Sequence, residues 1–558
     1  MATKRAQIIR HSQTGAFSRR TLLQGTAAGA AVTAMPVAGT RALAQTPEPE
    51  AAADQILQLG GESESPGIWF PTRTSGGVET QVFDLIFSRL IRFDDGYNLI
   101  SDLAESYDVS PDATEFTFNL RRDVQWSDGT PFTSKDVMFT YTLALRPEVG
   151  AAQYNKLRQI LGAEAFANGE TDTVEGLEAP DDYTFKITLA SSNVAFLIGN
   201  ASGNSLIWIV PEHVVGDIDP AAIDQHPFVQ NPNVGTGPFV FQEYVSDQYI
   251  LVNNNPNYFL GAPRLSQVYI RLGSQATQLA QLESGELHVM QAIDAREAER
   301  LSGSEVVDIV PTQGVGMFQT AIFNERFPDK RVRQAFMYGT DRQAIMDVVL
   351  RGQGTLVNSS IFGPEWAQFD DLNTYDFDPD MARQLLEEAE WDSSRTVQLI
   401  WESGYQAVET AAPVFQQQMS EIGVNVELLP LEEEAFEAKV LDEIDFDLAW
   451  FGGGAYYLDP DVSSTYYHSQ NWTPDGGNTT HFRSEELDQH FTDGRSTPDI
   501  AQRTEIYHRA AQILNEEVPT IFWWSENMIW GLNKKLQGVV PGPNTDIHWN
   551  IQEWWLSE

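Results

Sequence analysis

Hydrophobic and polar positions follow two different periods along most of the chain. Residues 115–120 and 184–189 alternate polar with apolar side chains, which is the period of a strand with one buried face. Residues 135–145, 379–389 and 414–422 have the spacing of amphipathic helices. Short runs of both kinds follow each other throughout, and no longer repeat is present. The pattern predicts an α/β fold and argues against a solenoid or propeller.

The ends of these segments carry the residues that turns and helix ends require. Residues 127–130 (Ser-Asp-Gly-Thr) predict a turn with glycine where a positive φ costs little. Thr133 or Ser134 can accept a hydrogen bond from the first turn of the helix that follows. Gly423 closes the helix at 414–422, and residues 424–428 then read as a strand. Connections of the form helix, glycine, strand favour the same α/β class.

The first 44 residues differ from the rest of the chain. A modestly apolar, alanine-rich stretch at 21–37 precedes Ala42-Leu43-Ala44, the small-x-small pattern that signal peptidases cleave. Residues 18–23 (Ser-Arg-Arg-Thr-Leu-Leu) are similar to the twin-arginine signature, which a translocon for folded proteins reads, although Gln24 stands where lysine is common. We predict a twin-arginine signal peptide over 1–44, cleaved between Ala44 and Gln45, with a disordered basic tail as the alternative. The segment has no acidic residue, and its basic residues are Lys4, Arg5, Arg10, Arg19, Arg20 and Arg41.

The composition restricts the compartment in which the protein can work and the partners that it can bind. The 558 residues include 35 Lys and Arg against 79 Asp and Glu, a net charge of −44, which argues against binding to nucleic acid or to anionic lipid. The chain has no cysteine, which excludes disulfides, thiolate catalysis, cysteine-bound zinc and a lipid anchor at the cleavage point. No segment after the leader is apolar enough to span a membrane. We therefore expect a soluble extracytoplasmic protein, periplasmic where the host has an outer membrane.

The most specific signal is a series of sequence phrases in a fixed order. It resembles family 5 of the extracytoplasmic solute-binding proteins of ABC importers, the oligopeptide-, dipeptide- and nickel-binding group, over essentially the whole chain after the leader. Several phrases also have structural interpretations: Trp126 fits a hairpin-to-helix corner, and Arg331 and Arg333 fit a helix start beside Asp329. The phrases are LAESY (103–107), LRRDVQWSDGTPF (120–132), GTGPF (235–239), NPNYF (255–259), LESGEL (282–287), RVRQAF (331–336), TDR (340–342), DFDL (445–448) and GGGAYYLDPD (452–461).

The resemblance implies a two-lobed periplasmic-binding-protein fold, type II, cluster C, with an extra third domain. The extra domain would occupy 81–205 and lobe II 313–524. The ligand would touch both lobes only when they are shut and so favour that state, which the membrane subunits of an ABC permease recognise. The protein would act as a monomer, without a cofactor. Lobe I would be discontinuous, comprising 45–80, 206–312 and 525–558.

The family resemblance also places the ligand. In this family the loop after the DFDL strand lines the cleft. Three glycines there would let a ligand approach the backbone, so that an extended peptide is held like an added strand. The alternative is a flexible or bulged turn. The loop residues are Gly452, Gly453, Gly454, Ala455, Tyr456 and Tyr457.

Two departures from the family pattern concern the peptide amine. Peptide binders of this family place an aspartate three residues before the acidic residue of the Asp-Pro pair, and Tyr456 stands there, which gives a hydrogen bond but no charge pairing with an α-ammonium group. A tryptophan often follows the preceding strand, and the nearest match is Glu433. Glu433 is the candidate if another carboxylate holds the amine.

Aromatic residues keep a second ligand class open. Trp401, Trp523 and Trp524 fall where family members contribute cleft walls, and Trp69 and Thr72 follow the first strand, again facing the cleft by analogy. Flat apolar rings stack on sugar faces as readily as on peptide side chains. The ligand is therefore predicted to be a di- or oligopeptide, with an oligosaccharide or other small solute as the alternative. For each tryptophan, a place in the core is the structural alternative.

Enzyme motifs are missing from the sequence. The patterns of a nucleophile elbow, a zinc protease and a phosphate-binding loop do not occur. Asp376, Asp378 and Asp380 are spaced somewhat like a calcium loop, but Pro379 interrupts them and favours a helix start. The nine histidines are scattered. We predict a binding protein with no catalytic residues and no metal; an adhesive surface protein would show repeats or an anchor.

Overall fold

A computed structural model gives the structure of most of the chain. The predicted leader lies outside the described residues, and so do Gly452, Gly453, Gly454 and Tyr457 of the predicted ligand loop. Of Ala455 and Tyr456, the backbone alone is described. The described residues are 55–61, 65, 67–73, 77–96, 98–198, 207–312, 314, 316–451, 455–456, 459–474, 476–542 and 547–558.

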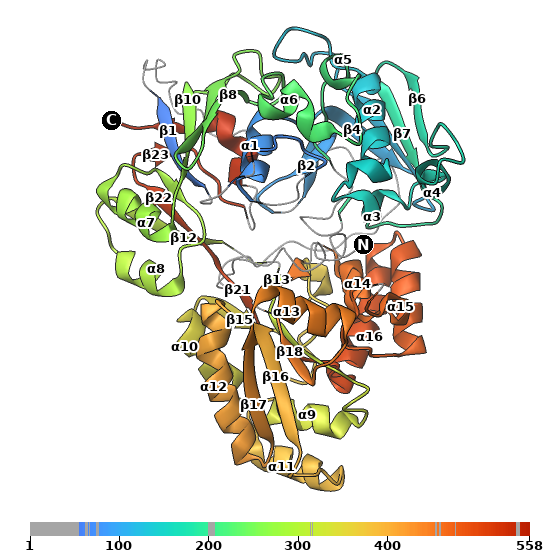
Figure 1. Cartoon of the computed structure of the whole chain (residues 1–558), viewed down its shortest axis with the longest axis vertical. Coiled ribbons are helices and arrows are strands. Elements are labelled where there is room, and N and C mark those ends of the chain that lie inside the picture. Colours follow the sequence, from blue (N-terminus) through green and yellow to red (C-terminus); the bar gives the residue numbers. More distant parts are fainter. Residues whose placement is uncertain are drawn as a thin grey trace.

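Figure 1 shows two bodies, one above the other, joined by strands near the middle of the molecule. The upper body is built on a seven-stranded mixed sheet, in which β1 is parallel to β10 and β11 while the other neighbours are antiparallel. Its helices include α1 (Gly77–Ile86), α7 (Gln275–Ser284) and α8 (Ala295–Leu301). In spatial order the strands are β12 (Val307–Thr312), β22 (Met528–Asn533), β11 (Val289–Met290), β1 (Ile56–Gly61), β10 (Gln267–Leu272), β9 (Tyr249–Asn254) and β8 (Phe239–Val245).

An antiparallel four-stranded sheet forms the other half of the upper body. The predicted strands at 115–120 and 184–189 are confirmed as its central pair, β5 and β7. The predicted cap is confirmed as well, because the Thr133 side chain accepts from the backbone of α2 (Ser134–Ala144) in a capping box with Asp136. The strands are β4 (Ala104–Val109), β5 (Glu115–Leu120), β7 (Thr184–Thr188) and β6 (Leu177–Asp181), with the short helices α3 (Tyr154–Leu157) and α4 (Ala163–Ala167) beside them.

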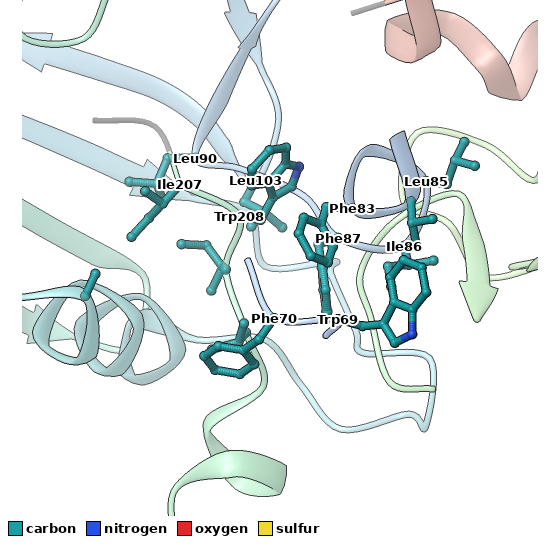
Figure 2. Packing of buried hydrophobic residues seen from close by; sticks show 14 of the residues in the cluster. Trp69, Phe70, Phe83, Leu85, Ile86, Phe87, Leu90, Leu103, Ile207 and Trp208 are labelled. Carbon is teal, nitrogen blue, oxygen red and sulfur yellow. The ribbon is translucent and has the colours of Figure 1, made fainter. Parts of the chain in front are cut away.

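One continuous apolar cluster joins the two sheets of the upper body. It includes Leu59 of β1 and Phe118 of β5, both fully buried. Figure 2 shows part of this cluster, in which Phe83 of α1 lies 5.5 Å from the Trp208 ring, centroid to centroid. Trp126 also lies in this cluster, 6.3 Å from Phe132, as the predicted hairpin-to-helix corner requires. The two halves are therefore held together by a common core.

The lower body has a five-stranded sheet covered by helices (Figure 1). Helix α11 (Pro379–Glu388) begins at Asp378, whose side chain accepts from the backbone of the first turn, so the predicted helix start is confirmed. Asp329 caps α9 and pairs with Arg331 at 2.6 Å, again as predicted. The strands in order are β17 (Asn425–Leu431), β16 (Thr396–Glu402), β18 (Leu448–Trp450), β14 (Gln319–Ile322) and β20 (Thr520–Phe522), and the longer helices are α9 (Lys330–Tyr338), α10 (Arg342–Leu350), α11, α12 (Gln406–Glu421), α15 (Glu485–Ser496) and α16 (Ile500–Glu517).

The helix predicted at 414–422 is longer than expected. Helix α12 starts at Gln406, and Pro413 lies inside it. The prediction started the helix one residue after Pro413, and a proline inside a helix is unfavourable because it removes a helical hydrogen bond. Val408 and Phe415, on either side of the proline, are both buried in the core of the lower body. This packing stabilises the helix despite the proline.

The chain crosses between the two sheets twice. The first crossing runs from β12 through β13 (Gly316–Met317) into β14, and the second runs from β20 through β21 (Trp524–Glu526) into β22. The crossings are hydrogen-bonded to each other, because the Phe318 N–H donates to the Trp524 carbonyl at 2.8 Å. Two adjoining connections of this kind are where a hinge between the bodies can form.

Candidate functional site

The carboxyl ends of three parallel strands meet at one edge of the lower sheet. β16 ends beside β18, with Trp401 next to Trp450, and β17 continues this parallel group on the other side of β16. The loop predicted to hold ligand follows β18, and Glu433 follows β17 as the first residue of α13 (Glu433–Glu437). Ligands of open α/β sheets bind outside the carboxyl ends of the strands. The fold therefore brings Trp401, Glu433 and the loop to the same edge.

Four tryptophans form a compact group at this edge. Trp450 stacks on Trp523 with ring centroids 4.3 Å apart and planes 2° from parallel, and Trp523 lies 5.5 Å from Trp524. All four, Trp401 included, are at most 5% exposed. The ring of Trp523 is covered by Trp450 and by Phe415, so in this conformation its face is not open for stacking on a sugar.

Three of these four indole N–H groups have no hydrogen-bond acceptor among the described residues. The Trp523 Nε1–H donates to Thr320 Oγ1 at 2.9 Å. The Nε1–H groups of Trp401, Trp450 and Trp524 are buried and meet no acceptor among the described residues. A buried donor without an acceptor costs about 1–3 kcal/mol, and buried tryptophan usually finds a partner. The sequence places Trp450 at the start of the predicted loop, two residues before Gly452, but it was not among the predicted ligand-binding residues.

On the upper body the two predicted residues are buried. Trp69 is 1% exposed and packs against Phe241 and Tyr244, with centroids 5.5 and 5.3 Å away. Its backbone N–H donates to the Val229 carbonyl at 2.9 Å. Thr72 is fully buried, and its hydroxyl meets no partner among the described residues. Figure 2 shows Trp69 as part of the apolar cluster around α1, so its ring serves the core in this conformation.

The predicted loop is fixed at both described ends. On one side β19 (Ala455–Tyr456) pairs antiparallel with β13, which places Tyr456 opposite Gly316. On the other side the Asp459 carboxylate accepts two hydrogen bonds from Arg503, at 2.9 and 2.8 Å, and both side chains are at most 4% exposed. Asp461 then pairs with Arg495 at 3.0 Å. The Asp-Pro signature therefore anchors the loop, a role that needed a distant arginine and was invisible in the sequence.

Glu526 is the residue at this junction that sequence reasoning missed. It ends β21, the strand that links the two sheets, and it is partly buried. No described residue donates a hydrogen bond to the Glu526 carboxylate or forms an ion pair with it. Burial raises the pKa of this carboxyl group to about 7. A carboxyl group with such a pKa, on the strand that connects the two sheets, is a candidate for a functional role. A lone glutamate in a short strand has no sequence pattern that would reveal it.

Comparison with known proteins identifies the family. Residues 98–474 match the model of the bacterial extracellular solute-binding proteins, family 5 Middle, which spans well over half of the chain. The chain belongs to this family. The resemblance inferred from the sequence phrases is thereby confirmed, and family 5 is a family of solute-binding proteins, not of enzymes.

Relatives of family 5 align over nearly the full length. The chain is 26% identical over 532 residues to the oligopeptide-binding protein AppA of Bacillus subtilis, covering 92% of this chain and 93% of AppA. Its fold is similar to that of the ABC transporter substrate-binding protein CtaP of Listeria monocytogenes, with a TM-score of 0.76 at 24% identity, over 91% and 100% of the two chains. It is also similar to AppA of Bacillus subtilis in complex with a nonapeptide, with a TM-score of 0.72 at 23% identity, over 90% and 100%. The predicted fold class is confirmed.

Two features of the described residues bear on other roles. No group of three or more His, Cys, Asp or Glu side chains there is arranged to hold a metal ion. No helix in the described part of the chain is long and apolar enough to cross a membrane. Of the scattered histidines, His213 pairs with Asp128 at 2.8 Å beside the turn at 127–130.

Proposed function

We propose that this protein is the extracytoplasmic substrate-binding component of an ABC importer and captures a di- or oligopeptide between its two bodies. The observation that carries the proposal is the match of almost the whole chain to an oligopeptide-binding relative and to a structure of that relative holding a nonapeptide. The two adjoining crossing strands supply the pivot that closure needs. The shut form would then deliver the peptide to the membrane subunits of the permease.

The proposed peptide site lies where the lower sheet faces the crossing strands. The loop with three glycines offers backbone N–H and C=O groups, which bind a peptide main chain whatever its sequence. Three buried indole donors without acceptors lie at the same edge and suit the carbonyl groups of a ligand. The covered rings of the tryptophan group give the oligosaccharide alternative no support. The proposed ligand-binding residues are Trp69, Thr72, Trp401, Glu433, Gly452, Gly453, Gly454, Ala455, Tyr456, Tyr457, Trp523 and Trp524.

The remaining proposals concern organisation and export. The leader over 1–44 would direct the chain to the twin-arginine translocon and be cleaved near Ala44-Gln45, leaving a periplasmic protein without a lipid anchor. Replacing Arg19 and Arg20 by lysine should then leave precursor in the cytoplasm. The mature chain would act as a monomer without catalysis, with lobe I at 45–80, 206–312 and 525–558, the extra domain at 81–205 and lobe II at 313–524.

Mass spectrometry of the mature protein from its own host tests the ligand class. Native spectra give the mass of what travels with the protein, and denaturation releases it for identification. A heterogeneous set of short peptides is expected, and titration of the emptied protein with one of them should change tryptophan fluorescence as the bodies close. A discrete sugar, or a protein that peptides do not perturb, would contradict peptide capture.

A further inference from the structure

A small cavity lies in the upper body, between segments that lead into its two sheets. Asp102, which lines it, stands two residues before β4 of the four-stranded sheet, and Pro238 stands directly before β8 of the seven-stranded sheet. His548, which also lines it, belongs to η9 (Ile547–Glu553), near the carboxyl end of the chain. The cavity has a volume of about 30 Å³, which is room for about two water molecules.

Two buried side chains that line this cavity have polar atoms without a partner. His548 is 3% exposed, and neither of its ring nitrogens has a hydrogen-bond partner among the described residues. Asp102 is 4% exposed; its Oδ2 accepts from the backbone N–H of Arg89 at 2.8 Å, whereas its Oδ1 meets no donor there. The two side chains therefore line one cavity without bonding to each other. Buried polar groups are nearly always paired with protein or with ordered water, so a partner between them is required.

The neighbours of His548 are paired within the protein. The Trp549 Nε1–H donates to the Val540 carbonyl at 3.0 Å. The Asn550 side chain donates to the Gly538 carbonyl at 2.8 Å and accepts from the Trp554 Nε1–H at 2.8 Å. These three bonds fix the position of η9, so the imidazole of His548 is held at the cavity.

The charges around the cavity favour a neutral occupant. Arg89 and Asp84, which both line it, already pair with each other at 2.9 Å. A cation would be repelled by Arg92, another lining residue, and an anion would meet the Asp102 oxygen that has no donor. Burial lowers the pKa of His548 to about 4, so the neutral ring has one donor and one acceptor nitrogen at pH 7. The occupant must therefore be small and neutral, and it must both donate and accept hydrogen bonds.

We propose that this cavity is a buried water site, in which one or two ordered water molecules bridge His548 and Asp102. A water molecule can accept from the imidazole N–H and donate to Asp102 Oδ1, which gives both groups a partner. Polar cavities of this size hold such water, whereas apolar cavities stay dry. The bridge joins the C-terminal segment to the start of the four-stranded sheet. It is a structural site in the upper body and is independent of the proposed peptide site.

A crystal structure of the mature protein tests the site directly, at a resolution that shows ordered water. Crystals would be grown once with chloride and once with bromide, because bromide reveals a bound halide by its anomalous scattering. The expected result is one or two water peaks within about 3.2 Å of a His548 ring nitrogen and of Asp102 Oδ1, with no bromide peak. A dry cavity, a bromide peak, or a direct hydrogen bond between His548 and Asp102 would each overturn the proposal.

Two substitutions at position 548 give a second readout, measured as thermal unfolding at neutral pH. His548→Phe removes both ring nitrogens and leaves the water and Asp102 Oδ1 without this partner, so the melting temperature should fall by at least about 2 °C. His548→Gln is the matched variant, because its amide still donates and accepts, and it should lose less than half as much. A phenylalanine variant as stable as the wild type, or equal losses in both variants, would contradict a water bridge. The crystal structure decides independently if neither side chain fits.

Discussion

At the scale of single residues, Asp459 and Arg503 form a buried ion pair next to the predicted ligand loop. Removing one partner of a buried pair leaves a desolvated charge, which typically costs 3–5 kcal/mol. We therefore expect Arg503→Met to lower the free energy of unfolding by about 3 kcal/mol or more, measured by urea denaturation. Arg509→Met is the control on the same helix, because its pair with Glu486 is about half exposed and contributes at most about 1 kcal/mol. Equal losses in both variants would show that Asp459 is not anchored by charge.

The burial of His548 in the upper body leads us to expect that the protein becomes less stable in acid. His548 is 3% exposed beside a small cavity that Asp102 also lines, and neither ring nitrogen has a partner among the described residues. Burial lowers the pKa of His548 to about 4, below its usual 6.5. The folded state therefore binds fewer protons than the unfolded state between these values, and stability falls as the pH drops from 6.5 to 4.

The matching measurement compares thermal unfolding of the wild type and His548→Phe across that range. The histidine contributes at most about 3 kcal/mol of the loss at pH 4, from two to three pKa units of about 1.4 kcal/mol each. The phenylalanine variant should lose less stability than the wild type on acidification, since other groups titrate in both proteins alike. Parallel pH profiles would show that His548 is not protonated on unfolding.

Roles that depend on near neighbours in the sequence could be predicted, whereas roles that depend on distant residues could not. Thr133, Asp329 and Asp378 were assigned as caps or pairs because their partners lie within a few positions. Arg503 was missed because its partner Asp459 lies 44 residues away in the sequence. The fully covered ring of Trp523 shows the same limit, since a tryptophan in a core and one facing a ligand carry identical local patterns.

At the scale of elements, Pro413 makes α12 a test of packing against local preference. A proline inside a helix costs about 3 kcal/mol through a lost hydrogen bond and a steric clash, partly offset by its stiffening of the unfolded chain. Pro413 is exposed, so Pro413→Ala should raise the free energy of unfolding by about 1–3 kcal/mol without disturbing the core. Pro379→Ala is the control, because Pro379 occupies the first helical position, where it needs no N–H donor; that change should be neutral or slightly destabilising.

Both helices show why element types were predicted better than their limits. The proline at 379 and the proline at 413 look alike in a local window, yet one starts a helix and the other lies within one. The difference comes from Val408 and Phe415, whose burial against the lower sheet is a tertiary fact. If Pro413→Ala does not raise the free energy of unfolding, α12 is already bent to accommodate the proline.

At the scale of the whole molecule, contacts between the two bodies set the balance of open and shut forms. The Val194 N–H of the upper body donates to the Arg495 carbonyl of the lower body at 3.0 Å, and at the opposite end Arg351 pairs with Glu299 at 2.8 Å. Lys156 of α3 faces the group formed by Asp459, Asp461 and the two arginines that pair with them. The two carboxylates are balanced by Arg495 and Arg503, so the partly buried ammonium group of Lys156 has no excess negative charge to compensate it.

The consequence for closure is a prediction about Lys156. Burial lowers the pKa of its ammonium group, and the attraction of Asp461 and Asp459 offsets this incompletely, so the charged lysine opposes the shut form. Lys156→Met should therefore increase the shut population and slow ligand release several-fold. Lys186→Met is the control, because it removes a partly exposed ion pair with Glu115 and should change neither quantity. Because the chain has no cysteine, one engineered cysteine on α4 and one on α15 suffice for single-molecule energy transfer between the bodies. A larger open population in Lys156→Met would show instead that the lysine holds the two bodies together through Asp461, and that its attraction to the acidic group exceeds the cost of its burial.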